Sequence, residues 1–102
     1  MDINRLFNID GKTALITGGS RGIGEMIAAG FLANGVKVYI TARKEAPLIE
    51  KAKELSEKFN GECIAIPCDL SNMEGIQKLA SDYLNHEDSL DILVNNAGAA
   101  WG

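Results

Sequence analysis

The chain has 102 residues, close to the commonest size of a single domain, and 46% of them are hydrophobic and 24% charged. This composition is typical of a globular protein and excludes a disordered one. The net charge of −4 argues against a general nucleic-acid binder or a protein that adheres to anionic membranes, so local geometry must hold any anionic ligand.

The sequence offers neither a membrane span nor a metal site. No apolar run approaches the ~20 residues that cross a bilayer. The opening MDINRLFNID lacks the basic and apolar regions of a secretory signal. With one histidine and two cysteines, the chain has no ligand set for zinc. The odd spacing of Cys63 and Cys68 would place them on opposite faces of a strand. We therefore expect both thiols to be reduced and packed as small apolar groups. Reduced cysteines in turn predict a cytoplasmic protein.

Four short segments rich in β-branched and apolar residues alternate with three longer segments of helical periodicity. The predicted strands are Lys12–Thr17, Val36–Thr41, Cys63–Pro67 and Asp91–Asn95. Their cores are almost continuously apolar, as in strands that are covered on both faces. Strands that alternate with helices in this way predict a parallel sheet with right-handed crossovers.

Each helical segment carries an apolar face and an end signal. The faces are expected at Ile23, Ile27, Gly30 and Phe31 in the first, Leu48, Ala52, Leu55 and Phe59 in the second, and Ile76, Leu79, Ala80 and Tyr83 in the third. The first two helices should end at Asn34–Gly35 and Asn60–Gly61. Ser71 with Glu74 predicts a capping box at the start of the third.

Together these elements predict an α/β fold, a Rossmann-type doubly wound parallel sheet with the strand order 3-2-1-4. Residues 1–102 should form one domain without internal repeats or linkers. The fourth strand would lie at an edge of the sheet, yet its apolar core, residues 92–94, is unsuited to face water. We therefore expect an incomplete fold, with further chain beside that strand.

The stretch LITGGSRGIG, residues 15–24, forms a glycine-rich turn between the first predicted strand and the first predicted helix. The first N–H groups of a helix have no intrahelical partner, and the helix dipole favours an anion there. Glycines lack Cβ and let a phosphate approach these donors. Gly19 to Gly24 has P-loop spacing, but Glu25-Met26 follows where an NTPase has Lys-Ser/Thr. The glycine spacing also differs from the usual G-x-G-x-x-G, so a purely structural turn is an alternative.

The end of the second predicted strand indicates which dinucleotide would bind. NAD-binding folds carry Asp or Glu there for the ribose 2′-hydroxyl, whereas this chain has Ala42 followed by Arg43. An arginine binds a 2′-phosphate through charge-assisted bonds, and Arg21 in the glycine-rich turn could add a second cation. Taken singly, each arginine could be a solvated surface charge. Together with the missing acid, they favour NADP(H) over NAD(H).

A second motif, Asn95-Asn96-Ala97-Gly98, follows the fourth predicted strand, at the end of the sheet where ligands of open α/β folds bind. Asn and Gly also suit a simple turn. In combination with Thr17-Gly18-x-x-x-Gly22-x-Gly24, however, this motif resembles the short-chain dehydrogenase/reductase family, classical type. The resemblance covers essentially the whole chain.

The resemblance implies roles for both motifs and for the end of the third strand. With Arg43 added, the expected cofactor-binding residues are Thr17, Gly18, Ser20, Arg21, Gly22, Ile23, Gly24, Arg43, Asp69, Leu70, Asn96, Ala97 and Gly98. The first loop would line the pyrophosphate, Asp69 would contact adenine, and residues 96–98 would flank the adenosine ribose. Thr17 would tie the two loops together. Without the resemblance, Asp69 would be interpreted as a polar residue before the Ser71 cap.

By the same resemblance, the protein is an NADP(H)-dependent oxidoreductase that moves a hydride between the nicotinamide and a carbonyl or secondary alcohol. The family's catalytic Ser, Tyr-x-x-x-Lys and helix Asn follow the second motif. Neither Tyr39 nor Tyr83 has Lys at the fourth following position. We therefore assign no catalytic residue and expect residues 1–102 alone to be an inactive, cofactor-binding half.

Both ends of the chain, MDINRLF and NNAGAAWG, are similar to bacterial 3-oxoacyl-(acyl-carrier-protein) reductase-like members, including the rhamnolipid-type branch. A small-molecule substrate and a homo-oligomer, commonly a tetramer in this family, are then expected, with no nucleic-acid or membrane partner. Two alternatives stay open, because a fold alone does not determine function. They are a non-catalytic dinucleotide-binding or regulatory module and an inactive truncated chain.

Overall fold

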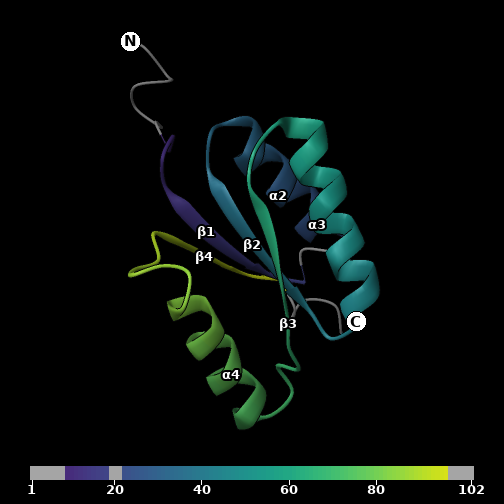
Figure 1. Ribbon diagram of the computed structural model, residues 1–102, viewed down its shortest axis with the longest axis vertical. Coiled ribbons are helices and arrows are strands. Elements are labelled where there is room, and N and C mark those ends of the chain that lie inside the picture. Colours follow the sequence, from purple (N-terminus) through teal and green to yellow (C-terminus); the bar gives the residue numbers. More distant parts are fainter. Residues whose placement is uncertain (1–8, 19–21, 97–102) are drawn as a thin grey trace.

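The computed structural model describes residues 9–18 and 22–96 of the chain (Figure 1). The elements in chain order are β1 (Thr13–Thr17), α2 (Gly22–Ala33), β2 (Lys37–Ala42), α3 (Glu45–Phe59), β3 (Cys63–Pro67), α4 (Met73–Leu84) and β4 (Ile92–Asn95). The strands are parallel and lie in the order β3-β2-β1-β4. This order confirms the predicted α/β fold, and every predicted strand agrees with the observed one to within one residue.

Helices cover both faces of the sheet, with α2 and α3 on one side and α4 on the other (Figure 1). Successive strand residues point to opposite faces. Ala14 and Ile16 of β1 therefore join the core under α2 and α3, while Leu15 between them joins the core under α4. Each fully buried Ile or Leu in these cores contributes about 1.5–3 kcal/mol. The continuous apolar runs of the strands are thus used on both faces.

The buried face of α2 differs from the predicted one. Its buried residues are Gly24, Ala28 and Leu32, whereas the predicted Ile23 is 67% exposed. The other predicted residues are half-buried or, at Gly30, exposed. The helix is apolar on most sides, so its sequence period selects no face. The small side chains at positions 24 and 28 let α2 lie close to β1 and to the loop after it, and this decides the face. In α3, by contrast, Leu48, Ala52 and Leu55 are buried as predicted.

The predicted helix ends are confirmed for α2 and α3. Gly35, two residues after α2, has φ +80°, and Asn60, directly after α3, has φ +50°. Both lie in the left-handed region that ends helices and that Gly and Asn tolerate best. These turns return the chain to the amino ends of β2 and β3.

The predicted capping box at the start of α4 is wrong. The N-cap is Asn72, whose Oδ1 accepts a hydrogen bond of 2.7 Å from the Gly75 N–H. Ser71 instead donates from both its N–H and its hydroxyl to the Asp69 carboxylate, a stronger acceptor two residues earlier. Further along α4, Leu79 and Tyr83 are buried as predicted, while Ile76 and Ala80 are exposed.

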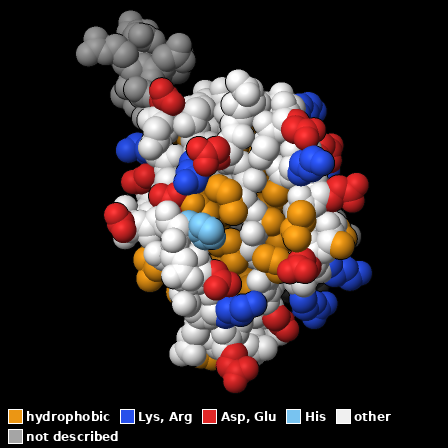
Figure 2. Space-filling model, viewed as in Figure 1, with side chains coloured by type: hydrophobic (Ala, Val, Ile, Leu, Met, Phe, Trp, Pro, Cys, Tyr) orange, Lys and Arg blue, Asp and Glu red, His pale blue; other side chains and the backbone are white. Residues whose placement is uncertain are grey.

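Apolar surface remains exposed beside α4 and at β4. Figure 2 shows apolar side chains gathered over the sheet between α3 and α4, with charged side chains around them. Ile64 and Leu70, which pack against the core under α4, are only partly buried. The strand β4 forms one edge of the sheet, as predicted, and its Leu93 is 61% exposed. None of the helices in the described part of the chain has the length and apolar character needed to cross a membrane.

The two cysteines lie on opposite faces of the sheet, as their spacing predicts. Cys63 belongs to the core under α2 and α3, and Cys68 to the core under α4. Both are buried and unpaired. Burial raises the pKa of the Cys63 thiol to about 12, so it stays protonated at neutral pH. The thiols pack as small apolar groups.

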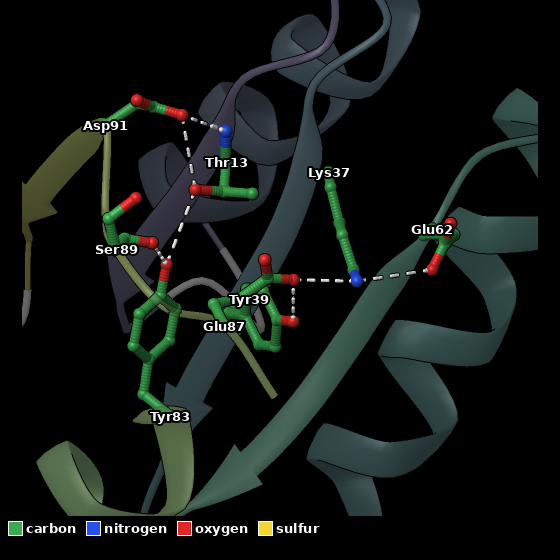
Figure 3. Close-up of polar contacts among 8 residues, drawn as sticks. All are labelled: Thr13, Lys37, Tyr39, Glu62, Tyr83, Glu87, Ser89 and Asp91. Carbon is green, nitrogen blue, oxygen red and sulfur yellow. Dashed lines mark hydrogen bonds and ion pairs between the residues drawn. The ribbon is translucent and has the colours of Figure 1, made fainter. Parts of the chain in front are cut away.

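An ion pair at the amino end of β2 holds the loop between α4 and β4 (Figure 3). Glu87 of this loop accepts a hydrogen bond of 2.5 Å from the Tyr39 hydroxyl and lies 2.7 Å from Lys37 Nζ. The hydrogen bond from Lys37, followed by that from Tyr39, lowers the pKa of the Glu87 carboxyl. Glu62 is a second, more exposed partner of Lys37, at 3.7 Å. The loop is therefore anchored to β2 by charge.

A second group of contacts joins the same loop to β1 (Figure 3). The Asp91 carboxylate accepts a hydrogen bond of 2.9 Å from the Thr13 N–H. The Tyr83 hydroxyl donates to the Ser89 carbonyl at 2.5 Å and also lies 3.3 Å from the Thr13 hydroxyl. Because Asp91 directly precedes β4, these contacts set the register in which β4 pairs with β1. That register delivers Asn95 and Asn96 to the opposite end of the sheet.

Candidate nucleotide-binding site

The carboxyl ends of β1 and β4 are joined through one buried threonine. The Thr17 hydroxyl donates to Asn95 Oδ1 at 3.0 Å and accepts a bond of 2.8 Å from the Asn96 N–H. Asn96 Nδ2 in turn donates to the Gly18 carbonyl at 3.3 Å. The predicted tie between the first loop and the second motif is therefore present as direct hydrogen bonds. It places the two loops next to each other at the end of the sheet where the strands have their carboxyl ends.

Glycines in the first loop serve distinct structural purposes. Gly18 and Gly22 have φ values of +71° and +62°, a region that side chains with Cβ disfavour. At Gly24, a Cβ would lie 2.2 Å from the Gly18 carbonyl oxygen and 2.8 Å from Asn96 Nδ2. The first turn of α2 can thus approach the loop and the second motif only because position 24 has no side chain. This contact fixes the position of the amino end of α2, whose first N–H groups have no intrahelical partner.

The acidic residue at this end of α2 is paired with a lysine of α3. Glu25, in the first turn of α2, lies 3.3 Å from Lys51 of α3, which also pairs with Glu54 at 2.9 Å. The hydrogen bonds to Glu54 and then to Glu25 raise the pKa of the Lys51 ammonium above its usual value. An acidic residue in the first turn would otherwise repel an anion at the helix terminus. Lys51 reduces that repulsion, and sequence reasoning did not find it because it lies 26 positions away on another helix.

Arg43 and Asp69 follow the neighbouring strands β2 and β3, Arg43 directly and Asp69 two residues beyond the strand end. The strands pair in parallel up to Ala42 and Pro67, and the Cys68 N–H extends the ladder by bonding the Ala42 carbonyl at 3.0 Å. Arg43 is thus opposite Cys68, and Asp69 comes one residue beyond that pair. Arg43 is exposed and Asp69 half-buried. Leu70 beside them packs against the core under α4.

The Asp69 carboxylate is held by its own loop. Oδ1 accepts from the Ser71 hydroxyl at 2.6 Å and from the Ser71 N–H at 2.9 Å. These two bonds lower the pKa of the Asp69 carboxyl, and the charge of Arg43 lowers it further. Asp69 is therefore an ionised acceptor at neutral pH. It lies at the same end of the sheet, the carboxyl end of the strands, as Arg43 and the amino end of α2.

The structure brings together most of the predicted site. Thr17, Gly18, Gly22, Ile23, Gly24, Arg43, Asp69, Leu70 and Asn96 all lie at the carboxyl ends of the strands or in the segments that follow them. Ser20, Arg21, Ala97 and Gly98 lie outside the described residues. Asn95 was not among the predicted site residues, although its place beside Asn96 was a signal for its bond to Thr17. No cluster of His, Cys, Asp and Glu within the described ranges could hold a metal ion.

Residues 12–102 match the sequence profile of the family described as short chain dehydrogenase. The chain belongs to the short-chain dehydrogenase family. Among relatives of this short-chain dehydrogenase is the rhamnolipids biosynthesis 3-oxoacyl-[acyl-carrier-protein] reductase of Pseudomonas aeruginosa. The two are 49% identical over 96 residues, which cover 94% of this chain and 37% of the relative. The chain thus spans little more than a third of the length of that oxidoreductase.

Solved structures of the family share the fold. The Pseudomonas aeruginosa RhlG/NADP active-site complex superimposes with a TM-score of 0.85 at 48% identity, covering 89% of this chain and 36% of that one. The L-sorbose reductase of Gluconobacter frateurii, complexed with NADPH and L-sorbose, also has a TM-score of 0.85, at 40% identity. That match covers 89% of this chain and 35% of the reductase. The predicted Rossmann-type fold and family are therefore confirmed.

Proposed function

We propose that the protein is an NADP(H)-dependent oxidoreductase acting on a carbonyl or secondary alcohol, and that residues 1–102 hold the adenosine and pyrophosphate part of the cofactor. The observation that carries the proposal is the exposed Arg43 directly after β2, where an NAD-binding fold has an acid. Two of the similar structures contain NADP or NADPH, which supports this choice of cofactor.

The residues at the carboxyl edge of the sheet fit a dinucleotide phosphate. The first N–H groups of α2 lack intrahelical partners, and the nearby Glu25 is paired with Lys51. The Arg43 guanidinium would bind the 2′-phosphate, Asp69 would accept from adenine, and Asn96 would flank the ribose. Ser20, Arg21, Ala97 and Gly98 join this site on the family resemblance. When bound, the nicotinamide supplies the hydride for the carbonyl or takes it from the alcohol.

Neither tyrosine of this chain suits the proton transfer that accompanies the hydride. The Tyr39 hydroxyl is bonded to Glu87, and burial, followed by that bond, raises its pKa to about 12. A catalytic acid or base works best with a pKa near the operating pH. The Tyr83 hydroxyl is bonded to the Ser89 carbonyl. Tyr39 lies in the first half of β2, and the Tyr83 hydroxyl lies beside Thr13 at the start of β1, so both are away from the carboxyl ends of the strands. We therefore propose that residues 1–102 alone are inactive.

A 3-oxoacyl thioester is the substrate class to test first, because a relative with 49% identity is named for one. A cytoplasmic location and a homo-oligomer, a tetramer in the family's usual form, complete the proposal. No nucleic-acid or membrane partner is proposed.

The test compares dissociation constants for NADPH and NADH in the full-length protein. Wild type is expected to prefer NADPH, and Arg43→Asp is expected to reverse the preference because an acid repels the 2′-phosphate. Lys53→Asp, the same charge change on the exposed side of α3, is the control and should leave the preference unchanged. An unaltered preference in Arg43→Asp would show that Arg43 is only a surface charge.

Turnover separates the enzyme from a non-catalytic dinucleotide-binding module. The full-length protein should oxidise NADPH in the presence of a 3-oxoacyl thioester, whereas a chain limited to residues 1–102 should not. Tight NADPH binding without turnover on any carbonyl would favour the regulatory module. Steady NADPH oxidation by residues 1–102 would contradict the proposed division of the site.

A further inference from the structure

The main chain of Asp69 is fixed by the first turn of α4. A Cβ on Gly75 would lie 1.5 Å from the Asp69 carbonyl oxygen, so α4 packs directly on that peptide. The same turn is capped by Asn72, which accepts from the Gly75 N–H. On the other side, the Cys68 N–H is bonded to the Ala42 carbonyl of β2. Only the side-chain torsions of Asp69 are left to decide where its carboxylate points.

Those torsions are set by Ser71. The serine hydroxyl and N–H both donate to the same carboxylate oxygen, Oδ1, at 2.6 and 2.9 Å. Two donors on one acceptor hold the carboxylate toward the start of α4. The bond from the hydroxyl is the one that a side-chain substitution can remove, because the N–H bond belongs to the backbone.

Arg43 is the cation that this carboxylate would otherwise attract. The register of β2 and β3 continues to Arg43 opposite Cys68, so Asp69 comes one residue beyond the position opposite Arg43, and the Arg43 charge acts on Asp69. Yet no ion pair within 4.0 Å joins them, although the structure describes both residues. An exposed arginine gains from such a pair, so a freely rotating carboxylate would compete with a phosphate for the guanidinium.

We propose that Ser71 is a positioning residue that holds the Asp69 carboxylate off Arg43 and so keeps the guanidinium available for the 2′-phosphate. The inference rests on the proposed binding of NADP(H). It assigns the preference between the two dinucleotides to three residues instead of one. Ser71 itself touches neither Arg43 nor the phosphate in this scheme and acts only through Asp69.

The experiment measures dissociation constants for NADPH and NADH in the full-length protein and its variants. Ser71→Ala should lower the preference for NADPH by up to about fivefold, the upper end of what an exposed ion pair formed in competition contributes. Ser71→Thr keeps the hydroxyl and should retain the wild-type preference. Ser81→Ala, which changes an exposed serine on α4, is the matched control and should also retain it.

The Asp69→Asn variant tests whether Ser71 acts through the carboxylate. An amide cannot form an ion pair with Arg43, so adding Ser71→Ala to Asp69→Asn should leave the preference unchanged. A change in this background of the same size as in wild type would overturn the inference.

Two results separate this inference from the proposed function. In the first, wild type prefers NADPH but Ser71→Ala weakens the binding of both dinucleotides equally. Ser71 is then merely structural and the inference is wrong, while the proposed function stands. If wild type binds neither dinucleotide, or prefers NADH, the proposed NADP(H) dependence fails and the inference fails with it.

Discussion

The hydroxyl of Thr17, at the end of β1, accepts a hydrogen bond of 2.8 Å from the N–H of Asn96, which lies 79 residues later in the chain. The same hydroxyl donates to Asn95 Oδ1 at 3.0 Å. One buried oxygen therefore acts as donor and acceptor between two adjacent strand ends. A side chain of the same shape without the hydroxyl cannot replace either bond.

Thr17→Val should lower the free energy of unfolding by about 1 kcal/mol, because it removes the hydrogen bonds of the buried hydroxyl to the exposed Asn95 and the half-buried Asn96. Urea unfolding followed by circular dichroism measures this change. Thr41→Val is the control, because the Thr41 hydroxyl is buried without a hydrogen-bond partner among the described residues, and only a weak interaction with the Cys68 thiol affects it. That variant should be neutral or more stable. Equal losses in both would contradict the role of Thr17.

Gly24→Ala should lower both the stability of the protein and its affinity for the cofactor. The added Cβ would meet the Gly18 carbonyl oxygen at 2.2 Å, so α2 must move away from the loop. Overpacking of this kind costs about 1–3 kcal/mol. Gly30→Ala in the same helix has open space around the new Cβ and should be about 1 kcal/mol more stable. Thermal unfolding and NADPH titration of the two variants check this contrast, and a stabilised Gly24→Ala would refute it.

Lys51→Gln should weaken the binding of NADPH and of NADH by the same factor, about two- to fivefold at low salt. The reason is that Glu25 would then repel the pyrophosphate. The matched control is Lys53→Gln, which removes an exposed charge from the same helix but not the one that pairs with Glu25. Fluorescence titration at two salt concentrations measures the effect, which should shrink as salt screens the charge. A change in the preference between the dinucleotides would argue against this explanation.

Because of the contacts among Lys37, Tyr39 and Glu87, the free energy of unfolding should be constant at intermediate pH and should fall at both acid and alkaline pH. The lowered pKa of Glu87 means that its contribution is complete above the ordinary value of 4.5 and is lost as the pH falls below it. The pKa of Tyr39 is raised to about 12, so its contribution is complete below 10.0 and is lost above that pH. The raised pKa of Lys37 acts in the same alkaline direction, above 10.5.

Urea unfolding between about pH 3 and 11 checks both of these falls. Glu87→Gln should lower the constant value and reduce the fall at acid pH, because the amide does not titrate. Glu62→Gln removes the outer partner of Lys37, whose side chain is 71% exposed, and should change stability by about 0.5 kcal/mol or less. A fall at acid pH as steep in Glu87→Gln as in wild type would mean that other carboxylates produce it.

Much of the fold follows from periodicity that is local in the chain. The strands were predicted to within one residue because apolar, β-branched runs of this length are covered on both faces wherever they occur. The face of α3 was also predictable, since polar residues surround Leu48, Ala52 and Leu55. The face of α2 was not, because Gly24 and Ala28 are selected for their small size and not for their hydrophobicity.

The cap of α4 was missed for a related reason. Ser71 and Asn72 are both good N-cap residues, and local sequence does not rank them. The choice depends on Asp69, whose carboxylate takes both donors of Ser71 and leaves Asn72 to cap the helix. Within the site, position in the chain could suggest Thr17, Gly24 and Arg43, but the compensation of Glu25 by Lys51 depends on how two helices pack.

By itself, the sequence determined the order of strands and helices, the parallel sheet, and the two motifs that place this chain in its family, because each depends on residues close together in the chain. The tertiary structure decided which small residues let α2 approach the loop, which donors hold Asp69, and how Glu87 and Asp91 set the register of β4. These outcomes depend on distances between groups up to 79 residues apart, and no local pattern encodes such distances.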